Sequence, residues 1–317
     1  MPDLSRILTA TAPLTLASVA RGAQPLVMSD LARASTSRAV FIAPDEAAMH
    51  SVAEAAKFFA PELEVIEFPA WDCLPYDRAS PALSVSAKRL AALHRLQSDK
   101  AGSQLLVTTA NAVLQRVLTP FRIRESVREF KQGTTIGHGS LSALLQRQGY
   151  SRTDTVVDHG EYALRGSIVD IFPSSLDQGL RLDFFGDELE SLRLFDPGTQ
   201  MTVGTLKQHL LLPASEALLD DDSIKRFRSR YREMFGATAT QDPLYEAVSE
   251  GRRLAGMEHW LPLFEERLAT VFDYLTPDDI VVVDSGAIGA ADERLKDVTD
   301  YHQAREKIAG QAAGSYR

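Results

Sequence analysis

Apolar residues in the first third of the chain alternate between buried-strand patterns and helical patterns. The strand-like runs are AVFIAP (39–44), LEVIEF (63–68) and QLLVTT (104–109). Each run is followed by a helical pattern, at 46–60, 84–97 and 110–118. Strands alternating with helices of this length imply parallel βαβ units with right-handed crossovers. Residues 1–122 are therefore predicted to form an α/β domain with a parallel sheet.

The pattern changes after residue 122. Only one helical segment is expected before residue 210, SLSALLQRQG (140–149). Strand patterns dominate instead, at IRESVREF (123–130), YALRGSIVDIF (162–172), LRLDFF (180–185) and ELESLRLF (188–195). Gly186-Asp187 between the last two is a tight hairpin signal. We therefore predict a small antiparallel α+β domain over residues 123–210.

Helical patterns return beyond residue 211 and predict a mostly helical third domain, residues 211–317. The helices are expected at 221–235, at 243–248 and from about 287 onward. One apolar strand, DIVVVDS (279–285), interrupts them. A single parallel-type strand cannot stand alone, so this strand should join the first domain's sheet or form a small sheet nearby.

Composition and charge narrow the possible functions. The net charge is −9, which argues against a broad grip on nucleic-acid phosphates. Cys73 is the only cysteine, so no internal disulfide can form, which suits a reducing cytoplasm. No apolar stretch is long enough for a membrane span and no signal peptide is apparent. We expect a cytoplasmic protein without membrane contact.

The residues for nucleotide hydrolysis are missing. A phosphate loop needs the pattern GxxxxGK[ST], but Gly-Lys occurs nowhere and the candidate segment 20–34 has no lysine. Asp284 could organise magnesium after its strand, but Ser285 follows it and helix capping is the favoured interpretation. The run Asp220 to Asp222 is likewise read as helix capping rather than a cation site. We expect no enzyme activity, cofactor or metal in this segment.

Two other features allow more than one interpretation. The loop FPAWDCLPYDRASP (68–81) could stack Trp71 or Tyr76 on a base, although a packed lid is favoured. His138 and His159 lack metal-ligand spacing and are expected at the surface. The arginines of the predicted helix 221–235 spread around it rather than forming one stripe, so a solvated face is favoured over a DNA-binding one; they are Arg226, Arg228, Arg230 and Arg232.

The strand LRLDFF alternates between two faces. Leu180, Leu182 and Phe184 are expected in the core, and Arg181, Asp183 and Phe185 on the opposite face. The same alternation in YALRGSIVDIF places Tyr162, Leu164, Ile168 and Phe172 on one face. Its second face then carries Ala163, Arg165, Ser167 and Val169, and Arg165 can share a face with Arg181.

Arginine and aromatic side chains on one sheet face are typical of protein-interface anchors. Arg152, just before the first of these strands, could extend such a surface. The alternative is a solvated face with internal ion pairs, from Arg181 to Asp183 or Glu190. The pattern alone leaves both interpretations open.

Three blocks of sequence carry a family resemblance, FPAWDCLPYDRASP, HGEYALRGSIVDIFP and RLDFFGDELESLRLFDPGTQ. They resemble the N-terminal region of the bacterial transcription-repair coupling factors, the Mfd family, which is similar to the repair protein UvrB. The resemblance implies a degenerate helicase-like α/β domain (1A), a small adaptor domain (2) and a mostly helical domain packing on the first (1B). Unlike UvrB, the chain lacks a phosphate loop and reads DSGA (284–287) after its apolar strand.

The resemblance also implies a partner. In this family the adaptor domain recruits the damage-sensing protein UvrA, and the matching positions are Arg165, Arg181 and Phe185, with Asp183 and Arg152 as neighbours. One UvrB arginine contact falls on Ala163 here. RNA polymerase, DNA, ATP and magnesium would engage motor domains outside this segment, and a monomer is expected. The alternative is an ATP-dependent helicase-like, UvrB-type module that binds damaged DNA.

Overall fold

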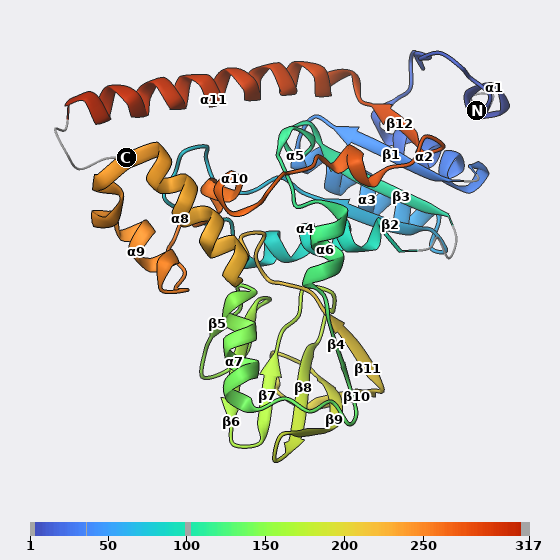
Figure 1. Ribbon diagram of the computed structural model, residues 1–317. Helices are drawn as coiled ribbons and strands as arrows, with labels where there is room; N and C mark the ends of the chain where they lie inside the picture. Colours follow the sequence, from blue (N-terminus) through green and yellow to red (C-terminus); the bar gives the residue numbers. More distant parts are fainter. Residues whose placement is uncertain (1–3, 36, 99–102, 312–317) are drawn as a thin grey trace. The chain divides into compact units, whose positions relative to one another are not determined.

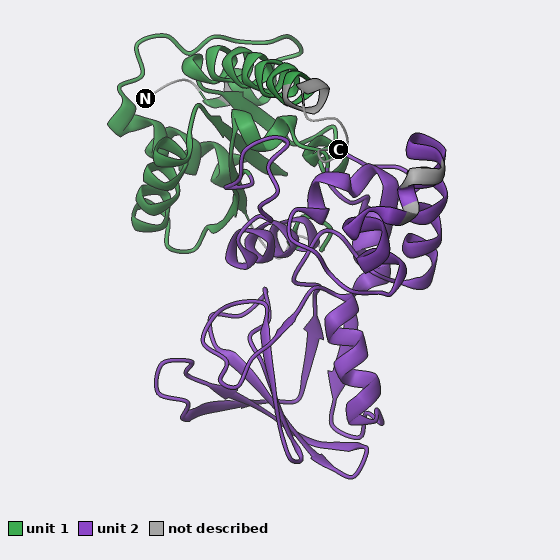
Figure 2. Cartoon of the chain, turned by 90° about the vertical axis from the view of Figure 1, so that its left-hand side faces the viewer, with its two compact units in different colours: residues 1–70, 95–116, 270–317 green, residues 71–94, 117–269 purple. Residues whose placement is uncertain are grey.

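The computed structural model describes residues 4–35, 37–98 and 103–311 (Figure 1). The chain divides into two compact units (Figure 2). Unit 1 combines residues 1–70, 95–116 and 270–317, and unit 2 combines residues 71–94 and 117–269. Both units therefore join segments from different predicted domains, and the division at residues 122 and 210 stays a prediction.

Unit 1 contains a four-stranded parallel sheet with the strand order β12-β1-β3-β2. Its strands are β1 (Arg38–Ala43), β2 (Glu64–Phe68), β3 (Gln104–Thr109) and β12 (Ile280–Val283). Its helices are α1 (Leu4–Leu8), η1 (Arg21–Ala23), α2 (Gln24–Ala34), α3 (Glu46–Phe59), α5 (Ala110–Leu114), η4 (Val271–Tyr274) and α11 (Ser285–Gln311). Val40 of β1 lies in register with Val281 of β12 and with Leu106 of β3. The prediction that the late apolar strand joins the first sheet is confirmed.

The ends of two strands in unit 1 carry helix caps. Asp45 follows β1, and its side chain accepts a hydrogen bond of 2.8 Å from the amide of Ala48 in α3. Asp284 follows β12 and accepts hydrogen bonds of 2.8 Å from the Gly286 amide and from Gln24 Nε2. The capping interpretation of Asp284 is therefore confirmed.

The β-rich part of unit 2 consists of a six-stranded sheet and a two-stranded ribbon, β11-β4. The strand order of the large sheet is β10-β9-β8-β7-β6-β5. Its strands are β5 (Ser151–Arg152), β6 (Glu161–Arg165), β7 (Ile168–Ile171), β8 (Gly179–Phe185), β9 (Glu188–Phe195) and β10 (Thr202–Leu206). The ribbon pairs β4 (Arg128–Lys131) with β11 (Gln208–Leu211). All pairs except β5 with β6 are antiparallel, as the predicted α+β class requires.

Helix α7 (His138–Arg147) covers one face of the large sheet (Figure 1). Leu141 and Leu145 of the helix pack into a buried cluster with side chains from the strands. The strand members of this cluster are Phe130, Tyr162, Val169, Ile171, Leu180, Leu182, Phe184, Leu189, Leu192 and Leu211. This cluster is the hydrophobic core of the β-rich part, and the predicted core positions of β8 are confirmed.

The predicted strand at 123–130 is wrong over its first half. Residues Pro120–Ser126 form helix α6, and β4 begins only at Arg128. Thr119 caps this helix and Pro120 occupies its first turn, a combination that favours helix initiation. The preceding helix is correspondingly shorter than predicted, because α5 ends at Leu114.

The helical part of unit 2 surrounds α8 (Asp221–Phe235). The other helices are α4 (Leu83–Arg95), η2 (Gly236–Gln241), α9 (Pro243–Ser249), η3 (Met257–Trp260) and α10 (Leu261–Phe264). Asp220 caps α8 by accepting a hydrogen bond of 2.9 Å from the amide of Ser223, which confirms the capping interpretation. Arg226 and Arg230 donate to the backbone carbonyls of Phe264 and Pro262, so two of the four arginines hold α10 in place.

In the part of the chain that the structure describes, no helix is long and apolar enough to span a membrane.

Candidate functional site

The face of the large sheet opposite α7, here called the outer face, carries four of the five predicted partner residues, namely Arg165, Arg181, Asp183 and Phe185. Two strand turns meet at one end of it, Arg165 to Ile168 between β6 and β7 and Phe185 to Glu188 between β8 and β9. The Phe184 amide donates a hydrogen bond of 3.0 Å to the Ser167 carbonyl, which ties the two turns together. Arg165 and Arg181 lie on this same face, as expected from alternation.

The predicted faces of YALRGSIVDIF are wrong beyond Arg165. Gly166 adopts φ +62° and starts a turn, so the segment is two antiparallel strands rather than one. Val169 pairs with Leu164 and Leu182 on the core face and is fully buried. Ile168 pairs with Arg165 on the outer face. The turn reverses the chain and shifts the alternation by one position.

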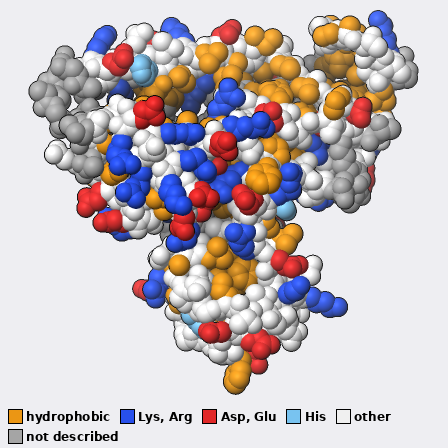
Figure 3. All heavy atoms as spheres, in the orientation of Figure 1, with side chains coloured by type: hydrophobic (Ala, Val, Ile, Leu, Met, Phe, Trp, Pro, Cys, Tyr) orange, Lys and Arg blue, Asp and Glu red, His pale blue; other side chains and the backbone are white. Residues whose placement is uncertain are grey.

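Phe185 is the free hydrophobic anchor of the outer face. Its side chain is 77% exposed at the end of β8, next to the turn at Gly186. Figure 3 shows hydrophobic and acidic side chains at the lower end of the view, where the β8–β9 hairpin lies in Figure 1. On its other side the hairpin is held by residues 134–136, because the Ile136 amide donates to Asp187 O and the Leu189 amide donates to Thr134 O. Phe185 therefore projects from a supported turn.

Arg165 is exposed but held at a defined position. Its Nη2 donates to the Asp154 carbonyl at 2.9 Å and to Thr155 Oγ1 at 3.1 Å. These acceptors are neutral, so among the described residues the positive charge of Arg165 has no carboxylate partner, and it can pair with an acidic group on another protein.

Arg181 is engaged inside the protein. Its guanidinium donates two hydrogen bonds, of 2.7 and 3.0 Å, to the carboxylate of Asp170, whose side chain is only 1% exposed. It also lies 4.8 Å from the centre of the Phe195 ring. The hydrogen bonds to Asp170 raise the pKa of Arg181, so its guanidinium stays charged. Arg181 is 15% exposed and is neither sealed in the core nor free.

Of the two predicted neighbours, Asp183 lies on the outer face as expected, whereas Arg152 does not. Asp183 pairs with Arg193 of β9, so the predicted internal pairs of Arg181 with Asp183 or Glu190 are wrong. Arg152 lies in register with Tyr162, whose hydroxyl contacts Ser142 of α7. Arg152 therefore belongs to the helix side of the sheet, and the structure does not bring it to the outer face.

Three residues that were not among the predicted ones organise the outer face. Asp170 and Arg193 pair with the predicted residues, and Phe195 packs beneath Arg181 against Val156 and Ala163. Opposite charges at 170 and 181 were visible in the sequence, but their pairing depends on the strand register. Ala163 is buried in this small cluster, so the position that departs from the UvrB pattern carries no exposed side chain.

The aromatic loop and the histidines are packed rather than free. Trp71 Nε1 donates a hydrogen bond of 2.8 Å to Glu216, which supports the packed-lid interpretation for this side chain. His138 lies 5.1 Å from the Phe184 ring and His159 lies 3.9 Å from the Phe172 ring, and both side chains are half-buried, so each keeps part of the surface exposure expected for it. Among the described residues, no group of three or more His, Cys, Asp or Glu side chains could hold a metal ion.

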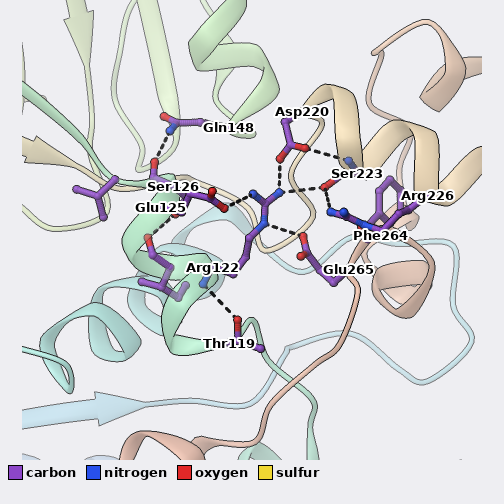
Figure 4. A network of polar contacts seen from close by, with 12 residues as sticks. Thr119, Arg122, Glu125, Ser126, Gln148, Asp220, Ser223, Arg226, Phe264 and Glu265 are labelled. Carbon is purple, nitrogen blue, oxygen red and sulfur yellow. Dashed lines mark hydrogen bonds and ion pairs between the residues drawn. The ribbon is translucent and has the colours of Figure 1, made fainter.

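A second polar cluster surrounds Arg122 beside a cavity of about 910 Å³ (Figure 4). Arg122 donates to Asp220, to Ser223 Oγ at 2.9 Å and to Glu265 Oε1 at 3.1 Å. Gln148 Nε2 donates to the Ser126 carbonyl nearby. Arg122 thus connects α6 with the start of α8 and the end of α10, while Gln148 Oε1 is buried without a hydrogen-bond partner among the described residues.

Comparison with known proteins identifies the β-rich part. Residues 129–216 match the family model described as UvrB interaction domain. The transcription-repair-coupling factors of Haemophilus influenzae and Escherichia coli are 36% and 33% identical over 271 residues, which is 85% of this chain and 23% of theirs. That of Bacillus subtilis is 26% identical over 266 residues, 78% of this chain and 21% of its own length. Over most of its length the chain is thus similar to transcription-repair-coupling factors, of which it spans about a quarter, and its residues 129–216 match the UvrB interaction domain.

Proposed function

We propose that this chain recruits a UvrA-type protein through the outer face of its UvrB interaction domain. The observation that carries the proposal is the presentation of Phe185, a large aromatic side chain that is 77% exposed on a supported turn. Protein interfaces are commonly anchored by such a residue together with an arginine that pairs with a carboxylate. Arg165 provides that arginine on the same face of the sheet.

The names of the relatives supply the biological setting of the proposal. They are transcription-repair-coupling factors, so recruitment of a UvrA-type protein would bring excision repair to stalled RNA polymerase. Because the chain spans about a quarter of these relatives, contacts with polymerase and DNA and the use of ATP and magnesium would fall to other parts of such proteins. The chain would act as a monomeric adaptor in the cytoplasm.

Capture by immobilised bacterial UvrA tests the proposal. Phe185→Ala is expected to weaken binding by about 2–4 kcal/mol, because a central aromatic anchor is lost. Arg165→Ala is expected to weaken it by about 1–2 kcal/mol, because one charged contact is lost. Phe58→Ala is a matched control, since Phe58 is 80% exposed on α3 in unit 1. Full retention of UvrA by both outer-face variants would contradict the proposal.

We also propose that unit 1 is a degenerate helicase-like domain that does not use ATP. Residues 20–34 form η1 and α2 without a lysine that could reach a terminal phosphate. Equilibrium dialysis with labelled ATP is therefore expected to give no saturable binding, with a UvrB protein as the positive control. Saturable binding would instead favour the helicase-like, UvrB-type alternative.

A further inference from the structure

Three large apolar side chains are exposed around two neighbouring loops of the β-rich part. Val157 is 50% exposed, Met201 is 69% exposed and Val203 is 59% exposed. The loops are joined directly, because Gln200 Nε2 donates a hydrogen bond of 2.8 Å to the Val156 carbonyl. Single exposed hydrophobic residues are common on protein surfaces, but three on hydrogen-bonded neighbouring segments are less so.

Gln200, which precedes Met201, is held in an unfavourable state. Its φ is +62°, in the left-handed region that side chains other than glycine rarely adopt. Its Oε1 is buried and has no hydrogen-bond partner among the described residues. Both features cost free energy, and such costs are often retained where a loop has a functional conformation.

The loop at 196–201 is nevertheless firmly fixed. Asp196 Oδ1 accepts hydrogen bonds from the amide and the hydroxyl of Thr199, at 2.7 and 2.8 Å. The Gln200 amide donates to the Asp196 carbonyl at 2.7 Å, and the Asp196 amide donates to the Met201 carbonyl at 2.9 Å. Met201 therefore projects from a preorganised loop, which lowers the conformational entropy cost of binding.

The apolar loops are continuous with the proposed binding site. Arg165 donates to Asp154 O and Thr155 Oγ1 in the first loop, two residues before Val157. Arg181 donates to the Gln200 carbonyl in the second loop at 3.4 Å. All these residues lie within the matched UvrB interaction domain. Arg165 is thus hydrogen-bonded to the first loop, and the Arg181–Asp170 pair is hydrogen-bonded to the second.

We infer that the contact surface for the UvrA-type partner extends from Phe185 and Arg165 onto Val157, Met201 and Val203. This inference rests on the proposed function and adds to it a second, apolar end of the interface. The partner surface that fits carries apolar side chains opposite the loops and a carboxylate opposite Arg165. Arg181 is then a positioning residue that holds the second loop rather than a main contact.

The test measures UvrA binding to the full chain carrying both Met201→Ser and Val203→Thr. We expect the Kd to rise by about tenfold to a hundredfold, the range of a moderate hot spot. The matched control carries Ile288→Ser and Val281→Thr, which replace exposed apolar side chains of unit 1 and should leave the Kd unchanged. Circular dichroism checks that both variants remain folded. Hydrogen exchange on wild-type protein should show slower exchange at residues 196–203 in the complex.

The outcomes separate the inference from the proposed function. The inference would be overturned if the Met201/Val203 variant kept the wild-type Kd and hydrogen exchange at 196–203 did not slow in the complex. If Phe185→Ala bound UvrA weakly in the same experiments, the proposed function would still stand. Failure of wild-type chain to bind UvrA would overturn both. If the double substitution alters only self-association in sedimentation measurements, the loops join two copies of this chain and the inference is wrong.

Discussion

Replacing Arg181 with alanine is expected to lower the local free energy of unfolding of β7 and β8 by about 3–5 kcal/mol, because it leaves a buried carboxylate without its partner. Asp170 is 1% exposed and accepts both of its strong hydrogen bonds from Arg181. Arg181 also packs on Phe195. Hydrogen exchange of the β7 and β8 amides measures this loss directly.

A double variant separates the charge from the packing. Arg181→Leu combined with Asp170→Leu removes both charges and keeps apolar volume, so it should recover most of the stability that Arg181→Ala loses. If the β7 and β8 amides of Arg181→Ala exchanged as slowly as in the wild type, the ion pair would contribute little to the stability of these strands. The result also affects binding experiments, because weak UvrA capture by Arg181→Ala would then reflect a disturbed outer face rather than a lost contact.

Gly149→Ala is the second substitution with a large expected effect. Gly149 ends α7 at φ +94°, and the Gly149 and Tyr150 amides donate to the carbonyls of Gln146 and Leu145, as in a Schellman motif. A Cβ at residue 149 would lie 2.5 Å from Ser215 Cβ and 2.9 Å from the Ser215 nitrogen. Backbone strain and overpacking each cost about 1–3 kcal/mol, so the variant should lose at least about 2 kcal/mol.

Gly133→Ala is the matched control for that experiment. Gly133 has a similar φ of +86°, but a Cβ there would meet nothing within 4 Å. Gly133→Ala should lower the free energy of unfolding only by the strain of an alanine in the left-handed region, about 1–2 kcal/mol. Urea denaturation followed by circular dichroism compares the two variants. If both variants lost the same free energy of unfolding, Ser215 would be able to move away from the new methyl group. The close packing of Gly149 on Ser215 would then not stabilise the contact between α7 and the segment after β11.

The alternation of strands and helices was enough to predict much of unit 1. Each strand predicted in unit 1 recurs, and the apolar run at 279–285 pairs with β1 because the backbone groups of a strand need hydrogen-bond partners. Helix α6 was missed because the apolar residues at 123–130 suggested a strand, whereas the Thr119-Pro120 cap directs a helix. Local capping chemistry outweighed apolar content at this position.

The residues of the candidate site could be predicted from the sequence, but the contacts that they make with one another could not. Alternation within β8 placed Arg181 and Phe185 on one face correctly. It could not reveal that Arg181 is engaged by Asp170, since that pairing depends on the register between β7 and β8. The turn at Gly166 shifted the alternation within β7, and the exposed residues at 157 and 201–203 lie on segments that the Gln200 hydrogen bond joins across more than forty positions of sequence.

The late strand β12 has a consequence for synthesis on the ribosome. β1 lies between β3 and β12, so one of its edges stays open until residues 280–283 have left the exit tunnel. Unit 2, whose residues all precede them, has by then been fully translated. A nascent chain that stops short of β12 would expose the unpaired edge of a strand buried along its length, which is a surface that invites chaperones or aggregation.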